Sequence, residues 1–253
     1  GDGRFRKMMS NIWKIMSSSR AAEPVFRSGN RDVPLKVVRS ARAARMSLRL
    51  AEGGAVVRLT LPRRAPLAPA LLWVESKRGW VEGQLAGLPM PQPVEPGMAF
   101  SLAGQNVVLD WAEGRPRRMK RDGDRLIAGG PRDGLEGRGL RWLRAEAKRM
   151  LTEETARYAA LAGVSVRAVG VGDPVSRWGS CAVDGTIRYS WRLILAPYAV
   201  MEATVAHEVA HRVHMNHGRA FHALVQALLG RNPAAERRWL SAHGKRLHAF
   251  GKG

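Results

Sequence analysis

The chain has 253 residues, of which 45% are hydrophobic and 25% are charged, the balance of an ordinary soluble globular protein. This composition excludes disorder over the whole length, and the longest uncharged apolar stretches, residues 65–74 and 193–201, are too short to cross a bilayer. The formal net charge is +21, from 42 Lys and Arg against 21 Asp and Glu, so weak association with nucleic acid or another polyanion is expected. The alternative is that the arginines, which are spread over the whole chain, reflect coding bias. The single cysteine, Cys181, excludes an internal disulfide and favours a reducing, cytoplasmic location.

Residues 1–32 are predicted to be a basic, flexible tail. Apolar residues recur there at helical spacing, with basic residues between them. The apolar positions are Phe5, Met8, Met9, Ile12, Trp13 and Met16. Such a basic amphipathic segment is typical of a transit peptide or a membrane-surface helix, or of a frayed extension with no such role.

Residues 34–130 are predicted to form a β-rich N-terminal domain. Apolar and polar side chains alternate over residues 57–61 and again over 107–111, which is the period of a half-buried strand. One helix is expected inside this region, over residues 70–85, before a proline-rich breaker. The glycine-rich segment 129–139 is the predicted domain boundary.

Residues 139–250 are predicted to form a second domain of helices and short strands, which makes the whole chain α+β. From about residue 140 the apolar positions follow the helical period instead of the strand period. The predicted elements are a helix over 140–161, strands over 164–171 and 186–195, and helices from about 197, over 220–229 and from 233.

The most informative segment is the histidine-rich run from His207 to His217. His207, Glu208 and His211 form an H-E-x-x-H motif, in which two imidazoles four residues apart project from one helix face and can share a tetrahedral zinc ion. Glu208 is turned away from the metal, so its carboxylate can take a proton from a zinc-bound water without being a ligand. Apolar neighbours on both sides favour a metal helix inside a core over a metal-free, histidine-rich surface.

A catalytic zinc needs a third protein ligand. His214 shares the helix face, but on a straight helix it lies about 10 Å along the axis from His207, which is too far for one ion to bridge. His217 can reach the ion if the helix ends and the chain reverses, and the asparagine and glycine that flank it permit such a reversal. We therefore predict His217 as the third ligand. Glu236, on the predicted last helix, is a more distant alternative.

Several motifs around this run resemble those of the YgjP-like metallopeptidases, a family akin to the SprT-like and WLM-type zinc proteases. Their order and spacing match together, which is more specific than the zinc motif alone, and the resemblance covers roughly residues 34–248. The matching segments are RWGSC at 177–181, DG at 184–185, WRLI at 191–194, AP at 196–197, NH at 216–217, and Phe221.

The resemblance implies a zincin-like α/β metal-binding domain with an active-site helix, placed after the β-rich region. It also implies zinc ligation by His207, His211 and His217, with Glu208 as the general base. Three positions depart from the family's pattern without removing a proposed ligand. They are Ser190, where asparagine is frequent, His214, where an acidic or basic residue is more frequent, and His222, where tryptophan is usual.

The RWGSC segment and the predicted strand 186–195 are expected to line the cleft. The pair Trp178 and Gly179 suits a strand end where two backbones approach closely. The strand 186–195 is then able to hold an extended peptide by main-chain pairing. The alternative is simple core packing between sheet and helix.

The preferred hypothesis is a zinc-dependent metallopeptidase with Zn²⁺ as cofactor and a protein or peptide as substrate, in which Glu208 activates the zinc-bound water. One alternative is metal-dependent hydrolysis of nucleotide phosphoanhydrides, which the many arginines suit although no Walker-type loop is present. The other is a basic, zinc-stabilised module associated with nucleic acid, against which the shortage of cysteine argues. The oxyanion-stabilising group stays open among Tyr189, Tyr198, His222 and nearby arginines, as does the oligomeric state.

Overall fold

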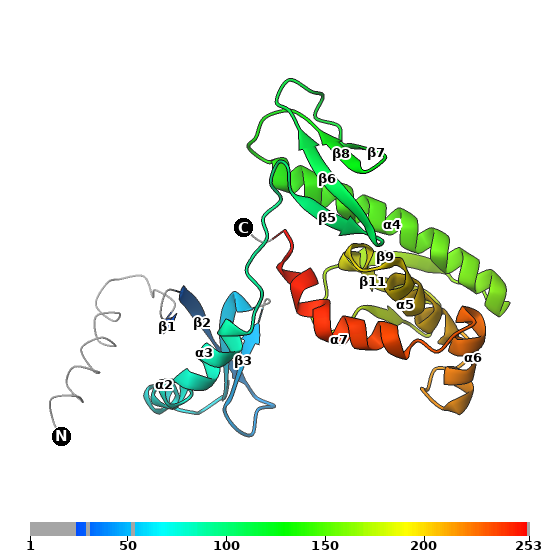
Figure 1. Cartoon of the computed structure of the whole chain (residues 1–253). Helices are drawn as coiled ribbons and strands as arrows, with labels where there is room; N and C mark the ends of the chain where they lie inside the picture. The colour runs from blue at the N-terminus through cyan, green and yellow to red at the C-terminus, as the bar shows by residue number, and fades with distance from the viewer. Residues whose placement is uncertain (1–23, 29–30, 52–53, 252–253) are drawn as a thin grey trace. The chain divides into compact units, whose positions relative to one another are not determined.

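The computed structural model describes residues 24–28, 31–51 and 54–251, and its helices and strands are labelled in Figure 1. The chain divides into two compact units between Leu88 and Pro89. Both units combine helices with β-sheet, which confirms the predicted α+β class. No helix in the described ranges has both the length and the apolar character needed to cross a membrane.

In the described part of the first unit, a four-stranded sheet has the order β1-β2-β4-β3, with β2 and β4 parallel and the other pairs antiparallel. The elements are β1 (Val25–Ser28), β2 (Arg31–Ser40), β3 (Ser47–Ala51), β4 (Val56–Pro62), α2 (Leu67–Ser76) and α3 (Arg78–Ala86). Alternate residues of β4, which are Val57, Leu59 and Leu61, are fully buried and share a core with Ala70 and Val81 of the helices. The predicted period-two pattern of β4 therefore marks the sheet face that the helices cover.

Two expectations for this unit are corrected. The single helix predicted over 70–85 is two helices, because Lys77 between them, with φ −97° and ψ 8°, leaves the helical region of backbone space. The predicted tail, 1–32, overlaps β1 and the start of β2, whose main-chain pairing makes them part of the sheet. Residues 1–23, which carry the predicted amphipathic segment, lie outside the described residues.

The second unit begins with a four-stranded sheet of order β5-β6-β8-β7, counted over its described residues. Its strands are β5 (Ala99–Leu102), β6 (Gln105–Trp111), β7 (Lys120–Asp122) and β8 (Arg125–Ala128), and the long helix α4 (Leu135–Ala162) follows. Leu102 and Leu109 of the sheet belong to the same buried core as Leu143 and Leu151 of α4.

Because the sheet and α4 share this core, the chain divides between Leu88 and Pro89 and not at the predicted boundary, 129–139. Residues 99–128, which were expected in the N-terminal domain, belong to the second unit. Their apolar faces are buried against the part of the chain that follows them, so the glycine-rich segment is a connection inside one unit.

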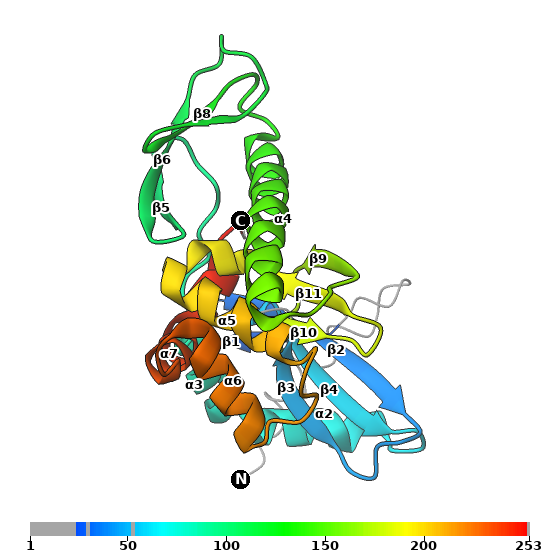
Figure 2. The same cartoon turned by 90° about the vertical axis from the view of Figure 1, so that its right-hand side faces the viewer.

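The rest of the second unit contains the elements that carry the histidine-rich run. They are β9 (Ala168–Gly172), β10 (Gly179–Cys181), β11 (Thr186–Ser190), the 3-10 helix η2 (Trp191–Leu195), α5 (Tyr198–Ala210), α6 (Arg219–Leu229) and α7 (Ala234–Ala249). Helix α5 lies against α4, α6, α7 and β10 and is largely buried (Figure 2).

The strand predicted over 186–195 ends at Ser190, where the side-chain oxygen accepts a hydrogen bond from the backbone N–H of Arg192 and starts η2. In the described sheet the strand order is β10-β11-β9, so β11 has partners on both sides. Main-chain pairing of a peptide with 186–195 is therefore excluded by the neighbouring strands. The edge that faces α5 belongs to β10.

Candidate metal centre

Helix α5 supplies the first two histidines. It starts directly after Pro197 and ends at Ala210, and His211 follows it while keeping helical dihedral angles, with φ −64° and ψ −16°. The rings of His207 and His211 therefore lie on the same side, with centroids 5.0 Å apart.

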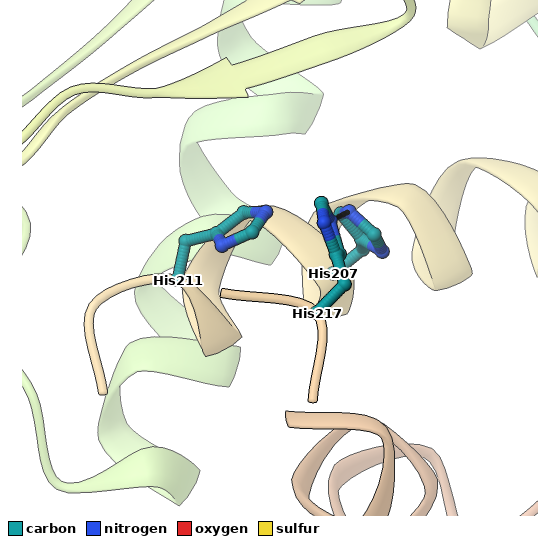
Figure 3. Close-up of side chains that lie close together, drawn as sticks. All are labelled: His207, His211 and His217. Atoms are coloured by element: carbon teal, nitrogen blue, oxygen red, sulfur yellow. Dashed lines mark hydrogen bonds between the residues drawn. The ribbon is translucent and has the colours of Figure 1, made fainter. Parts of the chain in front are cut away.

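His217 reaches the same place because the chain reverses after the helix. The backbone N–H of His214 bonds the carbonyl of Ala210 at 2.9 Å, and that of Gly218 bonds the carbonyl of Asn216 at 2.8 Å. The Nε2 atoms of His217 and His207 come within 3.1 Å of each other. Figure 3 shows these two side chains next to each other. In the described residues, these two histidines and His211 each offer one nitrogen within 4.8 Å of the others.

Phe221, on α6, forms the floor beneath the three imidazoles. It is 1% exposed, and its ring centroid lies 4.8 Å from that of His207, 4.6 Å from that of His211 and 4.7 Å from that of His217. Because one rigid ring contacts all three imidazoles, it limits the orientations that they can adopt. The sequence motif contained this residue, but its role became visible only in the packing.

The two other candidates for the third ligand are not part of the cluster. His214 contributes its backbone carbonyl, which accepts a hydrogen bond from Nδ1 of His211 at 3.1 Å and leaves Nε2 of His211 free for a metal. Glu236 accepts a hydrogen bond from Nε of Arg231 at 2.9 Å and is not part of the histidine cluster. The carboxylate of Glu236 is therefore paired with Arg231, on the loop before α7, and not with a metal site.

The protonation of the cluster suits metal binding. Burial lowers the pKa of His207 to about 4, and the neighbouring imidazoles act in the same direction. Burial also lowers the pKa of His211. Both rings are therefore neutral at pH 7, which is the form that coordinates a metal.

Glu208 lies beside the cluster on the side of β10. It is 6% exposed and accepts no hydrogen bond from the described residues. Burial raises the pKa of its carboxyl to about 7, against the opposing charge of Arg177. A Cβ atom at Gly179 would stand 2.5 Å from Oε1 of Glu208, so only glycine leaves room for the carboxylate. The close approach expected at Trp178 and Gly179 is thus between a backbone and this side chain.

The donor set fits a zinc ion. Three imidazole nitrogens converge, and no carboxylate or thiolate of the described residues joins them. Three protein ligands with one position left open is the arrangement of catalytic zinc sites, whereas structural sites are closed by a fourth ligand.

A family model described as "YgjP-like, metallopeptidase domain" matches residues 44–243. The chain belongs to the YgjP-like metallopeptidase family. This confirms the resemblance drawn from the sequence motifs, and the family implies a divalent metal, commonly zinc. The matched range runs from the first unit into the second and includes every histidine of the cluster. Neither a curated protein nor a solved structure matches the chain.

In this YgjP-like chain, Trp178 fixes the position of β10. Its ring stacks on His248 of α7 with centroids 4.9 Å apart, and its carbonyl accepts a hydrogen bond from the backbone N–H of Ser190 at 2.8 Å. A Cβ atom at Gly244 would lie 2.8 Å from the Trp178 ring, so a glycine on α7 makes room for the indole. The RWGSC motif therefore links β10 to α7 while it leaves space for Glu208.

Both tyrosines considered for the oxyanion are engaged in other contacts. The hydroxyl of Tyr189 is buried and lies 3.0 Å from the hydroxyl of Thr155. The hydroxyl of Tyr198 donates to Glu154 at 2.9 Å. His222 remains near the cluster, with its ring stacked 6.4 Å from that of His217.

Proposed function

We propose that this protein is a zinc-dependent metallopeptidase in which His207, His211 and His217 hold the ion and Glu208 is the general base. The observation that carries this proposal is the convergence of three imidazole nitrogens beside a buried carboxyl group that is not part of their cluster. Membership of the YgjP-like metallopeptidase family supports it.

Bound zinc supplies a Lewis acid that polarises the scissile carbonyl and acidifies water at neutral pH. The chain's own residues orient the metal ligands and transfer a proton. Glu208 has a pKa of about 7, close to the value at which a general base works best near neutral pH. The carbonyl of His214 and the ring of Phe221 hold the ligands in place, so that the imidazoles need little reorganisation when the ion binds.

The substrate is expected to lie along β10. This strand is at the edge of its sheet, and its first residue, Gly179, is in contact with Glu208. An extended peptide added to this edge by main-chain hydrogen bonds passes next to the general base. This arrangement favours a polypeptide over a compact nucleotide as substrate.

The test compares Glu208→Gln with the wild-type chain, both loaded with zinc, in hydrolysis of casein. The variant is expected to keep its metal, measured by mass spectrometry, and to lose nearly all turnover, because the amide cannot accept the proton. Glu153→Gln is the matched control, since Glu153 is 63% exposed and pairs with Arg149 on the surface. Full activity of Glu208→Gln would remove this residue from the mechanism.

The same proteins are incubated with nucleoside triphosphates to test the alternative bond class. Hydrolysis of the phosphoanhydride, lost in Glu208→Gln, with casein left intact would replace the peptidase by the phosphoanhydride hydrolase. Cleavage of casein with the triphosphates intact supports the peptidase.

A further inference from the structure

A cavity of about 210 Å³ lies directly beside His207 and Glu208. Its walls are mostly apolar and come from three helices and from the segment around β10. They include Trp178, Val200, Val225, Pro233 and Leu240. A cavity of about 150 Å³ lined by apolar side chains holds a benzene molecule, so this one has room for one long amino-acid side chain.

The one buried carboxylate on these walls besides Glu208 is Glu236, which is 9% exposed. Its Oε1 accepts the hydrogen bond from Arg231, but its Oε2 is buried and has no partner among the described residues. A buried carboxylate oxygen without a donor is costly, and a donor brought by a ligand removes that cost.

The charges around Glu236 leave this end of the cavity negative. Arg231 is shared with Glu202, to which it donates at 2.8 Å. Arg157, the second cation on Glu202, is itself shared with Glu154. Three carboxylates are thus served by two guanidinium groups. Arg237 also lines the cavity but is solvent-exposed, so its charge is screened.

We propose that this cavity binds a lysine side chain of the substrate, from a residue flanking the cleaved bond, with its ammonium group paired with the carboxylate of Glu236. The proposal rests on the peptidase function proposed above. The aliphatic stem of lysine matches the apolar walls, and its compact ammonium group supplies the missing donor. Glu236, which the sequence analysis considered as an alternative metal ligand, would then determine the specificity for the substrate side chain.

The test uses the zinc-loaded chain and peptides that vary at the two positions flanking the cleaved bond. Norleucine is the matched probe, because it keeps the four-carbon stem and lacks the ammonium group. At one of the two positions, lysine is expected to raise kcat/KM about tenfold or more over norleucine, the effect of a charge-assisted hydrogen bond in a desolvated site. This comparison is made on the wild-type protein and does not depend on the folding of a variant.

Glu236→Gln is expected to bring lysine and norleucine peptides to similar kcat/KM values. Arg238→Gln, an exposed position on the same helix that does not line the cavity, is expected to keep the preference for lysine. Cleavage of the peptides without a preference for lysine overturns the proposal and leaves the peptidase function intact. Failure to cleave any peptide contradicts the peptidase function itself, so the two failures are distinguishable.

A second, independent observation concerns the first unit, where three cations stand side by side on one face of the sheet. Lys36 of β2 and Arg49 of β3 are both the direct cross-strand neighbours of Arg58 on β4. Adjacent strands are about 4.8 Å apart, so the backbone positions that carry the three cations span roughly 10 Å. Their neighbours in sequence, such as Leu35 and Val57, are buried on the opposite face, beneath the helices.

Like charges directly opposite each other destabilise a sheet unless an anion compensates them. No acidic side chain of the described residues pairs with these three cations, and Nε of Arg58 is buried without a partner. Residues 24–88 hold twelve Lys and Arg against four Asp and Glu. Among the described residues of β1 to β4, Phe26 is the one aromatic residue, and it is buried on the other face.

We propose that this row of Lys36, Arg58 and Arg49 binds the phosphate backbone of duplex nucleic acid. The lack of an aromatic side chain on this face argues against single strands, which are bound by base stacking, and against a membrane surface, where aromatic anchors are usual. Phosphates then supply the anions that the sheet lacks.

The test measures binding of the full chain to a fluorescent DNA duplex over a range of salt concentrations. Replacing all three cations by Gln is expected to weaken binding and to lower the slope of log K against log salt by nearly three, at about 0.9 per lost phosphate contact. Replacing Arg42, Arg45 and Arg64, three exposed loop cations of the same unit, removes the same charge and is expected to change the slope much less. Equal effects of both triple variants, or binding to phosphatidylserine vesicles but not to the duplex, would overturn the proposal.

Discussion

The carboxylate of Glu208 lies against the backbone of Gly179, so closely that a Cβ atom at position 179 would stand 2.5 Å from Oε1. The general-base candidate on α5 and the edge strand β10 are therefore positioned by the same contact. Because that contact tolerates no side chain, it ties the RWGSC motif to the H-E-x-x-H motif physically.

Gly179→Ala is expected to displace Glu208 and to lower turnover strongly while zinc stays bound. Overpacking at such a site costs about 1–3 kcal/mol of unfolding free energy. Gly83→Ala is the control, because nothing lies within 4 Å of a Cβ there and the position is helical, so the change is expected to be neutral or slightly stabilising. Chemical denaturation and casein hydrolysis measure the two effects, and an unaffected Gly179→Ala enzyme contradicts the contact.

Phe221→Ala is expected to weaken zinc binding as well as the fold. Removing the ring leaves a cavity beneath all three imidazoles, which costs about 3–5 kcal/mol, and frees the ligands to reorient. A roughly 10- to 100-fold loss of zinc affinity is expected, as for other groups that orient ligands. Val225→Ala, also buried on α6 but outside the ring contacts, should lose stability with little change in affinity for zinc. Equal affinity losses in both variants would show that Phe221 has no orienting role.

His217→Ala and His214→Ala are expected to differ sharply in metal content. The first removes one of the three converging nitrogens, so the purified protein should hold much less than one zinc per chain. The second removes a side chain whose residue acts through its backbone carbonyl, which alanine retains. Elemental analysis of both purified variants checks this, and loss of zinc in His214→Ala alone would reverse the assignment.

Asp173→Asn is expected to destabilise the second unit. Arg192 is 3% exposed and bonds Asp173 through Nε at 2.6 Å and Nη2 at 2.9 Å, while its Nη1 holds the carbonyls of Leu247 and Phe250 at the end of α7. Removing one partner of a buried pair costs about 3–5 kcal/mol, and the loss should lie near 3 because Asp173 is 35% exposed. Urea denaturation at pH 7 measures it, and a change below about 1 kcal/mol would contradict the role of this pair.

The pair of Asp173 and Arg192 also predicts how the free energy of unfolding changes at acidic pH. Burial pushes the pKa of Asp173 upward, but the hydrogen bonds and charge of Arg192 outweigh it and hold the pKa below the usual 3.8. A carboxyl whose pKa is lower in the folded state contributes stability above its unfolded pKa and loses it as the pH falls through the folded value. Between pH 5 and 2, the wild-type protein should therefore lose more unfolding free energy than Asp173→Asn. Parallel pH profiles of the two proteins would contradict this.

Much of the candidate site could be predicted from the sequence because its parts are local. His207, Glu208 and His211 lie within five residues, and helical geometry alone places the two imidazoles together. The asparagine and glycine around His217 indicate the chain reversal that brings in the third nitrogen. The α+β class and the family likewise follow from periodicity and from motifs in a fixed order.

Only the tertiary structure shows which residues far apart in the sequence are in contact. Periodicity shows that one face of 99–128 is buried, but only the packing shows that it is buried against α4, which places the division of the chain at Leu88. It likewise shows that β10 and not β11 is the sheet edge, that Gly179 makes room for Glu208, and that Arg231 engages Glu236. A residue's own sequence neighbourhood determines which face it occupies, whereas the group that it meets there depends on how separate segments pack together.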